Sequence, residues 1–204
     1  QLIMCFLRDM SAESAMETYK QALPHKDKIV GIGLDSDERN NPPEKFSEVF
    51  ALAKQDGFHI TMHCDIDQEN SIGHIRTALM EIGVERLDHG TNIVEDPELV
   101  EYAKQHNIGF TCCLASNGFE VDDMKGKEFN ELLHKGLKVT VTSEDPAYFQ
   151  SYFVDDMFSL AEKYSLTKDD VVQLAKNSFE VAWIADDKKA EYIKLVDEYV
   201  AQAG

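Results

Sequence analysis

Two adjacent carboxylates stand at the end of one apolar run of this sequence. Glu144 and Asp145 follow the strand-like run Leu137–Thr142, and Pro146 prevents that run from continuing as a central strand. Paired carboxylates in this place can hold a cation or accept hydrogen bonds from a substrate. Glu144 and Asp145 are therefore candidate residues for binding a cation or a substrate.

Imidazole, thiol and carboxyl groups end three earlier strand-like runs. These ends are Met62–Asp65, Leu87–Gly90 and Cys112–Asn117. Such groups at the same end of successive strands are what a metal-assisted or acid/base active site requires. The sequence therefore predicts one site at the carboxyl ends of the strands.

One pattern recurs six times along the chain: a short apolar run, then polar residues, then a segment of helical periodicity. This is the pattern of a βα unit. The predicted strands are Leu2–Leu7, Ile29–Leu34, Phe58–Met62, Arg86–Asp88, Ile108–Cys113 and Leu137–Thr142. Six parallel strands with chemistry at their ends favour a (β/α) barrel. A doubly wound sheet is the second interpretation, but the glycine-rich first turn typical of it does not occur. We expect one domain over residues 1–204, with helices only after Asp145.

The expected helices have recognisable ends. Ser11 and Asp96 are predicted N-caps, and Thr167–Asp170 fits a capping box. Predicted left-handed helix terminators are Gly57, Gly83 and Gly136.

Composition and charge exclude several classes of partner. The formal net charge is −18, from 38 acidic and 20 basic residues, which argues against binding to nucleic acid or an anionic membrane. The apolar run Leu2–Leu7 is too short for a signal peptide or a membrane span. The four cysteines have no C-x-x-C spacing, so we expect reduced thiols and a cytoplasmic protein.

A set of motifs occurs in a fixed order along the chain. The motifs are Gly33–Glu38, Pro42–Phe46, His63, Arg86–Gly90, Cys113–Asn117 and Ser143–Tyr148. In this order they resemble the adenosine/adenine deaminase family of the amidohydrolase barrels. The residues of the motifs are more similar to those of adenine or N6-substituted adenine deaminases than to those of the adenosine enzymes. The resemblance runs from the first residue to about Ala185. It implies a (β/α)8 TIM barrel, of which this chain would hold about strands 3 to 8 and the C-terminal helices.

The resemblance also implies a reaction and a cofactor, Zn²⁺. Members of the family deaminate a 6-aminopurine by hydrolysis and release ammonia. By this resemblance His63 is a zinc ligand, Glu144 falls at the acidic zinc ligand, and His89 orients and deprotonates the water. Asp145 and Ser36 fall at purine contacts. Asp35, an acid at the same strand end as Ser36, is a further candidate for binding the purine.

The sequence departs from the family pattern at three places. It has no His-x-His pair, which the family places on its first strand, and it has Glu144 where the family has Asp. The usual His-Ala-Gly-Glu is replaced by His63–Glu69, so Asp65, Asp67 or Glu69 is the predicted proton donor. We expect this chain alone to be inactive, and to form a homo-oligomer or take a partner segment that supplies the missing strands. A non-catalytic remnant without zinc is the alternative.

The remaining candidates have simpler interpretations. Five histidines lie beside Lys or Asp or on helices and are expected at the surface: His25, His59, His74, His106 and His134. Cys112 and Cys113 are expected to be buried strand residues, because no basic group lies next to them to lower their pKa.

Overall fold

The computed structural model describes residues 1–203 of the chain. The fold consists of two compact units, Gln1–Ala103 and a second that begins at Lys104. The expectation of a single domain over residues 1–204 stays a prediction.

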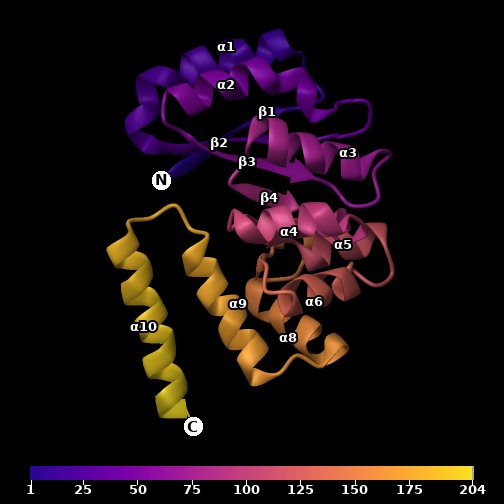
Figure 1. Cartoon of the computed structure of the whole chain (residues 1–204), viewed down its shortest axis with the longest axis vertical. Helices are drawn as coiled ribbons and strands as arrows, with labels where there is room; N and C mark the ends of the chain where they lie inside the picture. The colour runs from indigo at the N-terminus through magenta and orange to yellow at the C-terminus, as the bar shows by residue number, and fades with distance from the viewer. Residues whose placement is uncertain (204) are drawn as a thin grey trace. The chain divides into compact units, whose positions relative to one another are not determined.

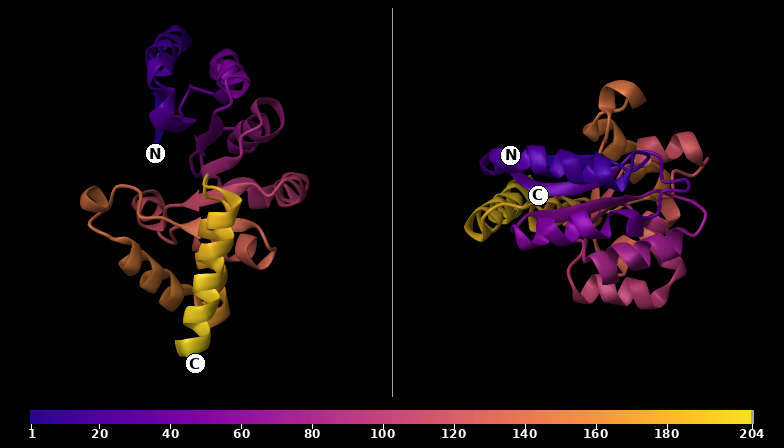
Figure 2. Two further views of the ribbon diagram at one scale, coloured as in Figure 1. Left: turned by 90° about the vertical axis from the view of Figure 1, so that its left-hand side faces the viewer. Right: turned by 90° about the horizontal axis from the view of Figure 1, so that it is seen from above.

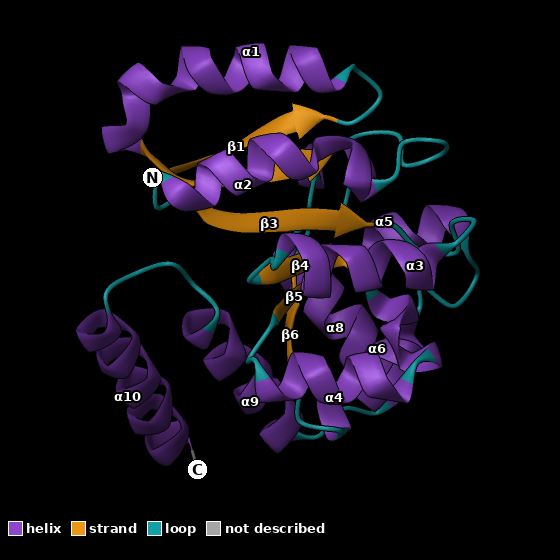
Figure 3. Ribbon diagram, turned by 45° about the horizontal axis from the view of Figure 1, so that its top comes forward, coloured by secondary structure: helices purple, strands orange, loops and turns teal. Residues whose placement is uncertain are grey.

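The first unit contains a sheet of four parallel strands that follow one another in chain order (Figures 1 and 3). They are β1 (Leu2–Leu7), β2 (Ile29–Asp35), β3 (His59–Cys64) and β4 (Arg86–His89). Because the strands are parallel and in order, their carboxyl ends lie along one edge of this sheet. The candidate residues that follow β2, β3 and β4 therefore share that edge.

Helices lie between the strands of the first unit and after its last strand. They are α1 (Ala12–Ala22), η1 (Leu23–Lys28), η2 (Pro43–Phe46), α2 (Ser47–Gln55), α3 (Ser71–Arg76), the π-helix η3 (Thr77–Ile82), η4 (Thr91–Glu95) and α4 (Pro97–Gln105). Helix α1 packs on β1 and α2 packs on β3, and the two helices contact each other (Figure 1). Crossover helices of this kind are what parallel neighbouring strands require.

The core of the first unit lies between these helices and the sheet. Phe6 of β1 and Phe50 of α2 pack edge to face with ring centroids 5.8 Å apart. Ile32 and Leu34 of β2 and Met62 of β3 are fully buried. Burial of side chains of this size stabilises the fold by about 1.5–3 kcal/mol each.

The second unit contains two parallel strands, β5 (Gly109–Cys112) and β6 (Lys138–Val141). Its helices are α5 (Leu114–Glu120), α6 (Gly126–His134), α7 (Pro146–Phe149), α8 (Phe153–Tyr164), α9 (Lys168–Glu180) and α10 (Asp186–Ala203). Helix α9 packs on β6 and α10 packs on α9; α10 is the long yellow helix of Figure 2. No helix in the described part of the chain is long and apolar enough to cross a membrane.

The local signals in the sequence are confirmed. All six predicted strands form: Leu2–Leu7 has the predicted bounds, and the others have ends that differ by at most two residues. Ser11 caps α1 by accepting a hydrogen bond from the Ser14 amide at 3.2 Å, and Asp96 accepts from the Glu98 and Leu99 amides. The three predicted glycine terminators all have positive φ: 80° at Gly57, 73° at Gly83 and 82° at Gly136.

Candidate active site

His63 lies at the end of β3 and is half-buried. Its Nδ1 is 3.4 Å from Oδ2 of Asp88 on β4. The same carboxylate oxygen accepts a hydrogen bond from Thr61 Oγ1 at 2.8 Å, which fixes its position. An imidazole held next to an anchored carboxylate has a defined orientation, as a metal-binding histidine requires.

His89 ends β4 and packs against His63. The rings meet edge to face with centroids 5.1 Å apart, and a nitrogen of one ring lies within 4.8 Å of a nitrogen of the other. His89 is only 5% exposed, and its Nε2 lies 3.8 Å from Asp65 Oδ1. The end of this sheet therefore brings two imidazoles and one carboxyl group together.

Four of the candidate residues have a left-handed backbone. The φ angles are 73° at Ser36, 52° at Asp67, 61° at His89 and 51° at Glu144. This conformation is costly for residues other than glycine and is concentrated at active sites, where the surrounding structure enforces it. Each of these positions follows or ends a strand. The backbone conformation thus agrees with their selection as candidates from the sequence.

The acids after β3 have different surroundings. Burial raises the pKa of Asp65, against the opposing effect of His89. Asp67 is exposed and tied to Asn92, whose Nδ2 donates to Asp67 Oδ1 at 2.9 Å and whose Oδ1 accepts from the Asp67 amide at 3.1 Å. Glu69 is exposed. Asp65 therefore lies beside His89 and is partly desolvated.

Asp35 ends β2, and its environment also favours the neutral acid. Burial raises the pKa of Asp35, with the Asp88 carboxylate adding to the shift. Neighbouring Cys5 has its pKa raised to about 12 by burial and by Asp35 and Asp88. The next residue, Ser36, is exposed. This edge of the first unit therefore carries the carboxyl groups of Asp35, Asp65 and Asp88, and burial partly desolvates those of Asp35 and Asp65.

Glu144 and Asp145 belong to the second unit, where they are exposed after β6. The Asp145 carbonyl accepts hydrogen bonds from the amides of Tyr148 at 2.9 Å and Phe149 at 3.0 Å, which starts α7. The predicted meeting of this pair with His63 and His89 stays a prediction.

Three buried residues near the site were not found from the sequence. Arg8 is 0% exposed, Glu38 1% and His74 7%. The expectation of a surface His74 was wrong, because its Nδ1 lies 2.5 Å from Glu38 Oε1. Helical periodicity alone did not reveal a polar partner 36 residues away in the chain.

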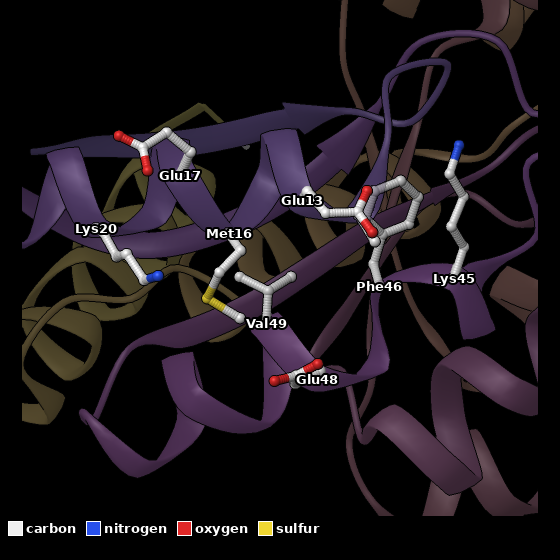
Figure 4. Close-up of a pocket in the computed structure, with 9 residues that line it drawn as sticks. Glu13, Met16, Glu17, Lys20, Lys45, Phe46, Glu48 and Val49 are labelled. Atoms are coloured by element: carbon white, nitrogen blue, oxygen red, sulfur yellow. The ribbon is translucent and has the colours of Figure 1, made fainter.

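One surface groove of the first unit holds none of the candidate residues. It lies between α1 and the segment from η2 to α2, and Figure 4 shows its side chains. Met16 and Val49 supply apolar surface, and charged groups of both signs stand around them, among them Glu13, Lys20 and Lys45. The groove has a volume of about 380 Å³. The residues that line this groove are not residues of the candidate site.

The four cysteines are free thiols. Cys64, Cys112 and Cys113 are buried, as expected for the last two, and burial raises the pKa of Cys64 well above its ordinary value. Neither Cys5 nor Cys64 has the lowered pKa of a nucleophilic cysteine.

Comparison with known proteins identifies similar chains. The family model described as adenosine deaminase matches residues 1–199. An uncharacterized deaminase of Schizosaccharomyces pombe is 49% identical over 202 residues, and an adenine deaminase of Psychrobacter cryohalolentis is 42% identical over 202 residues. In both cases the match covers 98% of this chain and 60% of the relative. The chain thus spans about 60% of the length of these relatives.

Solved structures with the same fold include an adenine deaminase from Arthrobacter aurescens. It has a TM-score of 0.91 and 35% identity, and the match covers 98% of this chain and 61% of that one. An amidohydrolase from Burkholderia ambifaria, solved with bound Zn, has a TM-score of 0.84 at 24% identity and shares the fold, over 99% of this chain and 59% of that one. The predicted fold class, part of an amidohydrolase (β/α)8 barrel with six parallel strands, is confirmed.

Proposed function

Because the chain belongs to the adenosine deaminase family, we propose that it is part of an enzyme that hydrolyses the 6-amino group of an adenine-type purine. The observation that carries the proposal is the contact of His63 with His89, beside Asp65, at the ends of two neighbouring strands. The name adenine deaminase, given to relatives 42% identical, supports adenine as a substrate. N6-substituted adenines and adenosine are the other 6-aminopurines to test.

In the proposed reaction water adds to C6 of the purine and the amino group leaves as ammonia, which yields a 6-oxopurine. His89 accepts the proton of the attacking water, for which a buried imidazole of fixed orientation is suited. Attack at C6 places negative charge on a ring nitrogen, and a protonated acid neutralises that charge. We assign this proton to Asp65, because burial raises its pKa and it lies next to His89.

Zinc is part of the proposal. The donor chemistry fits: His63 offers an imidazole and Glu144 a carboxylate, which are ligands that catalytic zinc takes. The nitrogens of His63 and His89 are close enough for one residue to bind an ion and the other to contact its water. A bound zinc supplies Lewis acidity that lowers the pKa of water to about 7.

Three residues contact the purine in this proposal. Asp35 and Ser36 follow β2 on the edge that carries His63 and His89, and Asp145 follows β6. A carboxyl group with a raised pKa, such as Asp35, can donate a hydrogen bond to a ring nitrogen.

Location and assembly complete the proposal. Four free thiols suit a reducing compartment, so we place the protein in the cytoplasm. The net charge of −18 supports a small-molecule substrate rather than nucleic acid. The remaining barrel strands come from a segment in the same protein or from a partner chain, and a homo-oligomer is one form of that assembly.

The experiment compares the chain alone with a chimera. In the chimera, the segment that precedes the matched region in the Psychrobacter adenine deaminase is joined to Gln1. Zinc content and ammonia release from adenine, N6-substituted adenines and adenosine are measured, with a His63→Ala chimera as control. We expect about one zinc per chimera chain and turnover, as a catalytic zinc site with its full ligand set provides.

Two outcomes contradict the proposal. A folded chimera that binds zinc but releases no ammonia from any of the purines refutes deamination. A folded chimera without zinc or turnover favours the second candidate, a non-catalytic remnant of the family.

A further inference from the structure

A buried ion pair connects three loops at the edge of the sheet that carries the candidate site. Arg8 follows β1, and its Nη1 lies 3.3 Å from Oε2 of Glu38, which lies in the loop after β2. Both side chains are almost completely buried, with exposed fractions of 0% and 1%. A buried pair of charges is retained only when good geometry and further hydrogen bonds offset the loss of hydration.

The further hydrogen bonds of this pair go to the end of β3. Arg8 Nη1 donates to the carbonyl oxygen of His63 at 2.8 Å. Glu38 Oε2 accepts from the backbone amide of Asp65 at 2.7 Å. The two buried charges thus hold the backbone on both sides of Cys64, whose own side chain is buried.

Other contacts fix the pair itself. The Arg8 Nε donates to the Asn41 carbonyl at 3.1 Å, and the Arg8 amide donates to the Asp35 carbonyl at 3.0 Å. The second carboxylate oxygen of Glu38 lies 2.5 Å from Nδ1 of His74 on α3. Arg8 and Glu38 are therefore also bound to the end of β2, to the loop after it and to helix α3, none of which belongs to β3.

We propose that Arg8 and Glu38, supported by His74, are positioning residues that set the backbone of His63 and Asp65 and so the alignment of these side chains with His89. The inference rests on the proposed function for its catalytic meaning, but its geometric claim concerns the chain by itself. Hydrogen bonds to charged partners are short and directional, so they define the backbone position more strictly than apolar packing does. A displacement of about 1 Å at such a site lowers the rate by up to about 100-fold.

The first experiment measures amide hydrogen exchange by NMR on the full 204-residue chain. We expect Glu38→Ala to speed exchange of the Asp65 amide by about tenfold or more beyond the change in global unfolding, because that amide loses a charged acceptor. Glu38→Gln keeps a carbonyl oxygen that can accept from Asp65. We therefore expect it to preserve the protection of this amide even where it lowers stability.

A second readout follows the imidazole nitrogen signals. We expect those of His63 and His89 to shift in Glu38→Ala and in Arg8→Lys, since lysine cannot reproduce the two-point contact of the guanidinium. His25 and His59 of the same unit serve as internal references and should not move. If Glu38→Ala does not fold, Glu38→Asp, which keeps the charge but is one methylene shorter, takes its place with the same expectations.

A matched control separates positioning from general stability. Tyr19→Phe removes the hydrogen bond of a buried Tyr19 hydroxyl to Asp56, elsewhere in the first unit. We expect it to lower stability without moving the His63 and His89 signals. Asp65 exchange that follows global stability in all variants, or histidine signals that move equally in Tyr19→Phe, would overturn the proposal.

The chimera supplies the catalytic readout. Glu38→Ala should lower kcat by about tenfold or more with a small change in KM, because the groups displaced act on the reacting atoms. Glu38→Gln should recover most of that loss. An inactive wild-type chimera would refute the proposed function, whereas the NMR results would still decide whether Arg8 and Glu38 position the site. An active chimera in which Glu38→Ala keeps full kcat would overturn the positioning role.

Discussion

Asp65 Oδ1 lies 3.8 Å from Nε2 of His89, at the ends of two strands that pair in parallel. Asp67, two residues further on, is exposed and engaged with Asn92. The backbone amide of Asp65 is held by Glu38, so its side chain leaves the strand end from a fixed point. The structure thus places Asp65 beside His89, whereas the sequence alone leaves the three acids equivalent.

The first prediction tests that distinction in the active chimera. Asp65→Asn removes the proton donor but keeps the shape of the side chain, and we expect kcat to fall by about 100-fold or more. Asp67→Asn and Glu69→Gln are the matched controls and should change kcat by less than about threefold, since both side chains are exposed. Steady-state ammonia release measures all three. A larger loss in Asp67→Asn than in Asp65→Asn would move the assignment to Asp67.

The second prediction concerns thiol reactivity. The pKa of Cys5 is raised to about 12 and that of Cys64 is also raised, in both cases chiefly by burial, so neither thiol is ionised at neutral pH. We expect alkylation by iodoacetamide at pH 8 to be much slower in the folded chain than for a free cysteine, and the Cys5 rate to rise with pH up to pH 10 without a plateau. Mass spectrometry of timed samples gives the rates. All four cysteines should react fully after unfolding. A fast-reacting Cys5 at pH 7 would contradict the raised pKa of this half-buried thiol.

Local sequence signals predicted most of the fold. Apolar runs and caps such as Ser11 depend on neighbouring residues, so a pass along the chain finds them. His63 and His89 were selected as candidates from the sequence, because the carboxyl ends of neighbouring parallel strands lie at one edge of a sheet. Arg8 and Glu38 were missed because their partners are 27 to 55 positions away in the chain and are brought together by packing. The proposed choice of Asp65 over Asp67 and Glu69 likewise rests on the burial of Asp65 and its distance to His89, neither of which the sequence gives.

The third prediction uses the close approach of β1 and β3 to Gly33 of β2. A Cβ added at Gly33 of β2 would lie 2.6 Å from Cys5 Sγ and 3.1 Å from Thr61 Cγ2. We expect Gly33→Ala to lower the free energy of unfolding by about 1–3 kcal/mol through overpacking. Cys5→Ala removes the closer atom, so the double variant should lose less than the sum of the two single variants. Urea unfolding of the four proteins gives this coupling. Additive losses would show that Cys5 is not the obstacle.

The fourth prediction concerns the attachment of α9 to β6. Asn177 is 1% exposed, and its Nδ2 donates to the Val139 carbonyl at 2.9 Å, while Gln173 donates to its Oδ1 at 2.9 Å. We expect Asn177→Leu to lower the free energy of unfolding by about 1–3 kcal/mol, because the Val139 carbonyl and the Gln173 side-chain amide lose their hydrogen-bond partner. Chemical denaturation measures the loss, and Gln173→Leu, which removes only the more peripheral partner, should cost less. Equal losses in the two variants would mean that the bond to β6 adds nothing.

The last prediction is a pH dependence at the start of α9. Hydrogen bonds from the side chain and backbone of Thr167 lower the pKa of Asp170, with His134 adding to the shift. The ionised carboxylate is therefore favoured in the folded chain, so its stabilisation is present above the ordinary pKa of 3.8 and is lost as the pH falls through the lower folded value. Asp170→Asn should lower the free energy of unfolding by about 0.5–1 kcal/mol at pH 7 and by progressively less as the pH falls below 3.8, the ordinary pKa.

Asp169→Asn is the matched control for this prediction, since it removes one charge from the same helical turn but none of the capping hydrogen bonds. Denaturant unfolding at a series of pH values between 2.5 and 7, about the range over which such a carboxyl group titrates, measures both variants. The difference between them should be largest near neutral pH and vanish at the acid end. A penalty for Asp170→Asn that is the same at every pH would show that the carboxylate charge does not stabilise this cap.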